Sequence, residues 1–381
     1  MIAYGNVAYF VAMLVLAVPA VVLGLLGRTI TRYGMAATVV MVTGLMLHSP
    51  AQAPYLAGFL ALETALMKGH LAFTGRFGRK VAWERRLTVA AALAPLVVVK
   101  LTAAFPVPSL GFIGVSYLTF RAVQVVLEIS DGLIKEFRLL DYLYFLAFFP
   151  TLASGPIDRS RRFGQDAHLG LDATSYSRLL GRGLWLLLLG AVYKFVAAAW
   201  FADRLGEVGG GPSGMVAYMY LYGLDLFFDF AGYSHMAVGA SYIFGIRTPM
   251  NFRLPFVSES IKDFWNRWHI SLSFWLRDFL YTRLLMALLR RKTFKQKTTA
   301  SHVAFVVNML AMGLWHGIAL HYVVYGLFHG ILLVVNDIYE RRSSFYARFH
   351  RTPAYRIAAI VVTFHLVMFS FLIFSGHLIT L

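Results

Sequence analysis

The chain has 381 residues, of which 59% are hydrophobic and only 14% are charged, and its formal net charge is +17. A soluble domain averages about 25% charged residues, so this composition favours a membrane protein over two or three soluble domains. Cysteine is absent, which excludes disulfides and a thiolate nucleophile, and no nucleic-acid-binding motif accompanies the basic charge, which we assign to membrane lipids.

Apolar runs follow one another along the chain, and several approach the roughly 20 residues that a membrane-spanning helix needs. The first run has no basic region before it, so we interpret it as a retained helix and not as a cleaved signal peptide. Two short runs flank "HSPAQAP", whose prolines predict a tight turn, and another short run is a candidate for entering the membrane and returning. The predicted spans are 6–27, 34–48, 52–67, 87–105, 109–130, 139–154, 179–202, 215–245, 300–315, 318–338 and 357–378.

The linkers between these spans largely alternate between two kinds, one rich in Lys and Arg and the other nearly free of both residues. Those rich in Lys and Arg are "KGHLAFTGRFGRK", "IKEFR", "DRSRRF", "RTPMNFRLPF", "RRKTFKQK" and "ERRSSFYARFHR". The positive-inside rule places these linkers in the cytoplasm, and it places both termini and the stretch at 316–322 outside. No linker is long enough for a soluble domain, so we predict an all-α polytopic membrane protein with one domain over residues 1–381.

The segment "SESIKDFWNRWHISLSFWLRDFLYTRLL" (258–285) departs from the spanning pattern. Its tryptophans and leucines recur at helical spacing, and charged residues lie between them. This pattern predicts an amphipathic helix that lies in the membrane interface or re-enters the membrane. A simple interfacial anchor is the alternative.

Polar residues gather on one face of the predicted span 215–245, where they are costly unless they face a cavity or a partner. They are Tyr222, Asp225, Asp229 and Tyr233, followed by Ser234 and His235. Two carboxylates one turn apart repel each other unless a cation is near, and Arg121, which shares a face of span 109–130 with Glu128, is a candidate for that cation. The face therefore predicts either a cavity lining or a structural ion-pair network.

Histidines provide the candidate base. His316 in "LWHG" and His269 in "NRWHISLS" each have a structural alternative, because a single His on an apolar helix is commonly a hydrogen-bonded core residue. The sequence has no P-loop, no H-E-x-x-H and no G-x-S-x-G motif, and His316, His321 and His329 have no metal-binding spacing, so no metal is predicted. A neutral imidazole is well suited to take a proton from a hydroxyl that attacks an acyl group.

Five stretches resemble the membrane-bound O-acyltransferase superfamily and together span most of residues 110–340. They are "GVSYLTFRAVQVVLEISDGLIKE" (114–136), "FFPTLASGPIDRSRRF" (148–163), "DLFFDFAGYSHMAVGASYIFGI" (225–246), "PMNFRLPFVSESIKDFWNRWHISLSFWLRDFLY" (249–281) and "MGLWHG" (312–317). The first two stretches are more similar to the D-alanyl transfer branch than to the alginate O-acetylase branch.

The resemblance implies a ring of about eleven transmembrane helices, with re-entrant or interfacial helices, around a central funnel and tunnel. It implies transfer of a D-alanyl group to a hydroxyl of a teichoic-acid-like glycopolymer outside the cell membrane, with His316 as the general base and His269 as a second site residue. The donor would be a thioester on the phosphopantetheine arm of an acidic carrier protein, with no cofactor bound by the chain itself. A small single-span accessory protein is a further implied partner.

Two sets of residues complete the predicted site. The expected lining of the substrate tunnel comprises Trp315, Asn251, Tyr117, Arg121, Asp225, Asp229 and Ser234. The expected docking surface for the carrier comprises Arg290, Arg291, Lys292, Lys295 and Lys297, where basic charge complements an acidic partner. Polysaccharide O-acetyl transfer is the alternative reaction, and a proton-coupled transporter is the alternative class, although the paired repeats common in transporters are not seen.

Overall fold

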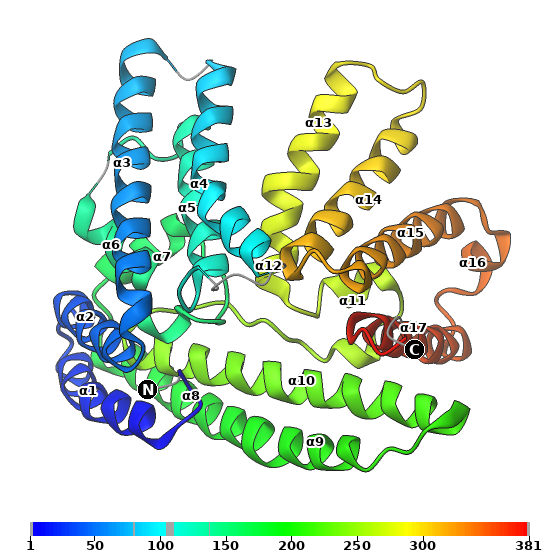
Figure 1. Cartoon of the computed structure of the whole chain (residues 1–381), viewed down its shortest axis with the longest axis horizontal. Coiled ribbons are helices and arrows are strands. Elements are labelled where there is room, and N and C mark those ends of the chain that lie inside the picture. The colour runs from blue at the N-terminus through cyan, green and yellow to red at the C-terminus, as the bar shows by residue number, and fades with distance from the viewer. Residues whose placement is uncertain (1–2, 79–80, 104–109, 137, 379–381) are drawn as a thin grey trace. The chain divides into compact units, whose positions relative to one another are not determined.

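The computed structural model describes residues 3–78, 81–103, 110–136 and 138–378, and within these ranges the chain is helical and has no strand (Figure 1). Within the described residues, six helices are long and apolar enough to cross a membrane, which supports a multi-pass membrane protein. These six candidate spans are Val7–Leu25, Pro50–Phe77, Ala173–Gly206, Lys297–His316, Leu320–Arg342 and Pro353–Phe374. The predicted span ends at 104–105 and 109 lie outside the described residues.

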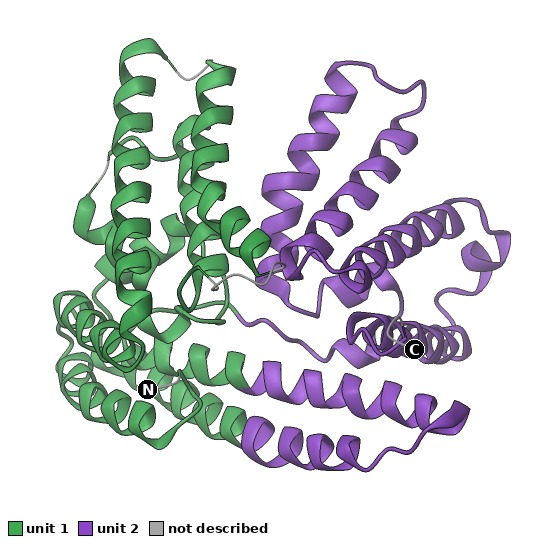
Figure 2. Cartoon of the chain, viewed as in Figure 1, with its two compact units in different colours: residues 1–191, 233–249 green, residues 192–232, 250–381 purple. Residues whose placement is uncertain are grey.

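The chain divides into two compact units (Figure 2). Unit 1 comprises residues 1–191 and 233–249, and unit 2 comprises residues 192–232 and 250–381. Unit 1 contains α1 (Val7–Leu25), α2 (Thr31–His48), η1 (Pro50–Gln52), α3 (Ala53–Phe77), α4 (Ala82–Thr102), α5 (Val115–Ser130), α6 (Leu139–Ala147), η2 (Phe149–Thr151), α7 (Ser160–His168) and nearly all of α8 (Ala173–Val192).

Unit 2 contains the remaining elements, and α10 (Gly211–Ile243) contributes to both units. They are η3 (Tyr193–Ala198), α9 (Ala199–Gly206), η4 (Pro255–Val257), α11 (Ile261–Trp265), α12 (Ile270–Leu276), η5 (Arg277–Tyr281), α13 (Thr282–Arg290), α14 (Lys297–His316), α15 (Leu320–Arg342), α16 (Ser344–Phe349) and α17 (Pro353–Phe374). The segments η3 and η5 are π-helical turns within longer helices.

Side-chain caps fix several helix starts. The Asn6 side chain accepts a hydrogen bond from the Tyr9 backbone N–H at 3.1 Å and begins α1, and Thr352 caps α17 in the same way, with Pro353 in the first turn. Such caps satisfy backbone donors that the first turn leaves unpaired, and proline at this position loses no helical hydrogen bond. The apolar runs therefore begin as helices close to where the sequence predicts.

The core of unit 1 consists of apolar and aromatic side chains from the segment before α1 and from α1, α2, α3, α5, α6, η2, α7, α8 and α10. Tyr4, Tyr9 and Phe149 are fully buried in it. In unit 2, α14 and α15 form a close antiparallel pair. A Cβ atom at Gly326 would lie 2.6 Å from the Met309 carbonyl oxygen. The two helices therefore approach more closely than any larger residue would permit.

Two sequence predictions need correction. The basic linker predicted from residue 68 is helical as far as Phe77, because no proline or positive-φ glycine stops α3 before Gly78. The segment 258–285, predicted as one helix, is divided into α11, α12, η5 and α13, with a break at His269. The spacing of the tryptophans gave no sign of this break, because side-chain spacing alone does not report backbone conformation.

Candidate functional site

His316 is the last residue of α14, and its half-buried ring lies among aromatic side chains. Its ring centroid is 4.6 Å from that of Trp315, 4.8 Å from that of Phe374 and 6.0 Å from that of Tyr322. These rings come from α14, α17 and α15, so three helices of unit 2 converge on the imidazole.

Gly317 explains how one of these rings approaches the backbone beside His316. A Cβ atom at this position would lie 2.6 Å from two ring carbons of Tyr322. This distance is well below a normal van der Waals contact, so a larger residue would displace either the ring or the turn. The "LWHG" motif thus provides both the imidazole and the space for its aromatic neighbour.

His269 lies at the break between α11 and α12, and it is only 3% exposed. Its ring centroid is 4.7 Å from that of Phe230 and 6.0 Å from that of Trp315. Burial, and to a smaller extent the His316 imidazole, lowers the pKa of His269 well below its ordinary value. Trp315 therefore contacts both predicted histidines, and His269 is neutral near pH 7.

The backbone at His269 is in the left-handed region, with φ 43° and ψ 50°. A non-glycine residue in this region costs on the order of 1–3 kcal/mol, so neighbouring contacts must hold it. Asn251 does this: its side-chain oxygen accepts hydrogen bonds from the Ser271 backbone N–H at 3.2 Å and the Ser271 hydroxyl at 2.6 Å. Its carbonyl accepts a third from the Ile270 N–H at 2.9 Å.

The polar face of α10 contains an ion pair that the sequence did not predict. Asp229 pairs with Lys194 of η3, so Lys194 replaces Arg121 as the cation expected beside the carboxylates. The signal was a single lysine in the apolar run "GAVYKFVAAAW". This contact favours the structural ion-pair alternative for Asp229. Asp225 lies one turn earlier on α10.

The other two histidines near "LWHG" have ring contacts of their own. His329 is fully buried, and its Nδ1 accepts a hydrogen bond from the Trp265 indole N–H at 3.3 Å. The His321 ring centroid lies 4.1 Å from that of Tyr322. Within the described residues, no group of three or more His, Asp or Glu side chains is arranged to hold a metal ion.

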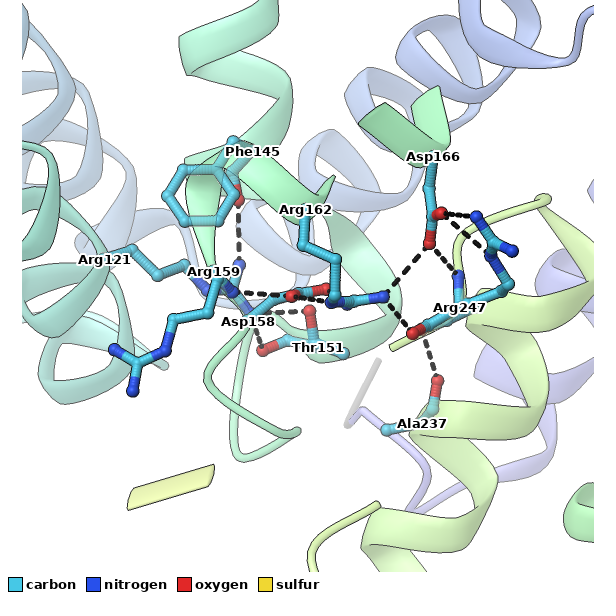
Figure 3. Close-up of polar contacts among 10 residues, drawn as sticks. Arg121, Phe145, Thr151, Asp158, Arg159, Arg162, Asp166, Ala237 and Arg247 are labelled. Carbon is cyan, nitrogen blue, oxygen red and sulfur yellow. Dashed lines mark hydrogen bonds and ion pairs between the residues drawn. The ribbon is translucent and has the colours of Figure 1, made fainter. Parts of the chain in front are cut away.

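Arg121 of α5 is fully buried in unit 1 and binds backbone carbonyls (Figure 3). Its guanidinium donates hydrogen bonds to the carbonyl oxygens of Phe145, Leu146 and Thr151 at 3.1, 2.9 and 2.9 Å. These carbonyls lie at the end of α6 and in η2, where helical partners are missing. The contacts favour a structural role for Arg121.

A chain of ion pairs continues from the "SGPIDRSRRF" stretch (Figure 3). Arg162 contacts Asp158 and also Asp166, at 3.0 Å. Arg247 donates to Asp166 from its backbone N–H and from Nε, both at 2.8 Å. The sequence did not predict this network because Asp166 and Arg247 are 81 residues apart.

The remaining predicted residues fall in both units. Tyr117 and Ser234 are buried in unit 1, and Tyr117 is hydrogen-bonded to Ser154. The predicted docking residues lie in unit 2, at the connection between α13 and α14, and all are exposed: Arg290, Arg291, Lys292, Lys295 and Lys297. Of the predicted site residues, the structure brings together Asn251, His269, Trp315 and His316 within unit 2.

Comparison with known proteins connects this geometry to a family. The profile of the membrane-bound O-acyltransferase family matches residues 210–379. A teichoic acid D-alanyltransferase of Bacillus subtilis (strain 168) is 36% identical over 98% of both chains, and one of Streptococcus thermophilus is 44% identical over 71% of this chain and 69% of its own. A probable alginate O-acetylase of Pseudomonas fluorescens is 34% identical over 58% of this chain and 44% of its own.

Proposed function

The chain belongs to the membrane-bound O-acyltransferase family, and on that basis we propose that it transfers a D-alanyl group to a teichoic acid. The donor is a thioester on the phosphopantetheine arm of a cytoplasmic carrier protein. The acceptor is a hydroxyl of a teichoic acid outside the membrane. The full-length similarity to teichoic acid D-alanyltransferases supports this reaction over other acyl transfers.

In the proposed mechanism, His316 accepts the proton of the acceptor hydroxyl as its oxygen attacks the thioester carbonyl carbon. The new C–O bond forms, the C–S bond breaks, and the electron pair leaves with the carrier thiolate, which then takes the proton. General-base catalysis contributes about 10²- to 10⁴-fold. Alignment of the two substrates contributes more, on the order of 7 kcal/mol at best.

The observation that carries this assignment is the position of His316 at the end of α14. The imidazole is half-buried among rings from three helices, so its surroundings exclude much of the water that would otherwise hydrolyse a thioester. His269 is more deeply buried than His316 and is neutral, and the Asn251 contacts hold the backbone beside it. It is therefore a positioning residue for the donor arm.

The exposed connection between α13 and α14 is the proposed docking surface for the carrier. Lys295 and Lys297 lie there with three further basic residues, and the described part of the chain shows no ion pair for any of the five. An acidic carrier would find these charges unneutralised, which favours rapid, salt-dependent association.

The full architecture that follows from the family is a ring of about eleven spans in the cell membrane, around a funnel from outside and a tunnel to the cytoplasm. Trp315 and Asn251, which both belong to unit 2, are the proposed tunnel-lining residues. The basic linkers face the cytoplasm in this arrangement. A small single-span accessory protein and membrane lipids are further proposed partners.

Acetyl transfer to a polysaccharide is the second candidate, because probable alginate O-acetylases are 31–34% identical to part of this chain. One experiment separates the two reactions. Alkali-released esters from cells with and without the gene are identified by mass spectrometry. Loss of ester-linked D-alanine supports the proposal, whereas loss of ester-linked acetate with unchanged alanine would replace it with the second candidate.

A further inference from the structure

Unit 2 contains a cavity of about 1000 Å³ that the proposed acyl transfer does not use. Its walls come from α15 and α17, from α16 between them, and from the start of α11. None of the predicted catalytic, tunnel-lining or docking residues lines it. The cavity is therefore a candidate for a separate binding site.

The long walls of the cavity are apolar and belong to two candidate membrane spans. Leu332 and Val335 line it from α15, and Ala358, Val362 and Leu366 line it from α17. In a bilayer, these side chains lie at the depth of lipid chains, where water is an unfavourable occupant. An acyl chain is therefore a suitable occupant of a cavity with such apolar walls.

The other end of the cavity is acidic and aromatic. Its carboxylates are Glu259, Asp263 and Glu340, and neither Lys nor Arg is among the lining residues. Tyr346 lies between two further tyrosines, with its ring centroid 5.5 Å from that of Tyr339 and 6.0 Å from that of Tyr355. Carboxylates together with aromatic faces favour an ammonium group.

Cations surround this end from outside the cavity. Arg356 pairs with Glu259 at 2.6 Å and Lys262 pairs with Glu340 at 3.5 Å, and these two basic side chains are 59% and 60% exposed. Such exposed pairs contribute little, so a ligand ammonium can share the carboxylates at small cost. Arg356, with exposed Arg348 and Arg351 nearby in sequence, is available to a phosphate.

We propose that this cavity binds an aminophospholipid. Its acyl chains lie between α15 and α17, its ammonium contacts Glu259, Glu340 and the tyrosine rings, and its phosphate meets Arg356 at the rim. An anionic headgroup without an ammonium group cannot make the contacts with the carboxylates and tyrosine rings and is disfavoured. The linker "ERRSSFYARFHR", expected in the cytoplasm, places the headgroup end in the inner leaflet.

The test is lipid binding by the full chain, measured by native mass spectrometry after delipidation. The probes are dioleoyl phosphatidylethanolamine, its N-acetylated form, which lacks the ammonium charge, and dioleoyl phosphatidylglycerol. We expect at least tenfold preference for phosphatidylethanolamine over the other two. Equal or stronger binding of phosphatidylglycerol, or of the N-acetylated lipid, would overturn the proposal.

Two variants locate the site. Ala358→Trp fills the cavity from α17, whereas Ile357→Trp, a matched change at a 64% exposed neighbour that does not line the cavity, leaves it open. We expect at least fivefold less bound phosphatidylethanolamine in Ala358→Trp and no loss in Ile357→Trp. Equal retention in both folded variants would contradict the assigned site. Since the readout is bound lipid, the result is independent of the acyl-transfer reaction.

Discussion

Arg121 in unit 1 and the two predicted histidines in unit 2 have different surroundings. In unit 1, the Arg121 guanidinium donates hydrogen bonds to three carbonyl oxygens, and Asp158, Arg162, Asp166 and Arg247 form a chain of opposite charges. In unit 2, the predicted histidines lie among aromatic rings. The hydrogen bonds of Arg121 indicate that it stabilises the fold, whereas we propose that His316 acts on a substrate. Substitution of Arg121 should therefore impair stability, and substitution of His316 should impair activity.

Removal of the Arg121 side chain should have the largest effect on stability. Arg121→Ala leaves the carbonyl oxygens of Phe145, Leu146 and Thr151 without their donors. Each unsatisfied buried group costs about 1–3 kcal/mol, so we expect a loss on the order of 3–5 kcal/mol. The measurement is thermal unfolding in detergent. The control is Arg32→Ala at an exposed position on α2, and equal effects of the two substitutions would contradict the structural role.

Neutralising the centre of the ion-pair chain should cost less. Asp166→Asn keeps the shape of the side chain but removes the charge shared by Arg162 and Arg247. Because both arginines are partly exposed, we expect destabilisation of about 2 kcal/mol, with catalytic rate per folded molecule unchanged. A variant that is fully stable but inactive would indicate that this network acts in catalysis and not in stabilising the fold.

Charge reversal on the docking surface should weaken carrier binding without loss of stability. For the double variant Lys295→Glu and Lys297→Glu, we expect about tenfold weaker binding of the acidic carrier and a shallower salt dependence. The matched control reverses the same charge at Arg348 and Arg351, which are also exposed. Titration of purified full-length chain with the carrier distinguishes them, and equal weakening in both would mean that net charge alone attracts the carrier.

The smallest expected effect is the pH dependence caused by His269. Its lowered pKa means that the unfolded chain binds more protons below pH 6.5, so this residue reduces stability as the pH falls. Between pH 7 and pH 5.5 we expect the free energy of unfolding to fall by about 1 kcal/mol through this residue. His269→Asn, which tolerates the left-handed backbone, should remove this dependence. The free energy of unfolding is measured at both pH values. Identical pH dependence in wild type and His269→Asn would contradict the assignment of this effect to His269.

Apolar run length was a good guide to the helices. The runs at 6–27, 300–315, 318–338 and 357–378 correspond to α1, α14, α15 and α17. The break at His269 was not predictable, because its left-handed backbone depends on hydrogen bonds that Ile270 and Ser271 donate to Asn251, eighteen positions before His269. Long-range pairs such as Asp166 with Arg247 were missed for the same reason. The "LWHG" histidine was predicted from its motif, while its proximity to His269 through Trp315 could be seen only in the fold.

The central claim is that His316 acts in chemistry and not in folding. The direct test measures two quantities in His316→Ala: ester-linked D-alanine in the cell envelope, and the melting temperature of the purified chain. We predict at least a 100-fold loss of transfer activity, from the contribution of general-base catalysis, with a melting temperature close to that of the wild type. Normal D-alanine esterification at normal protein abundance would contradict the account.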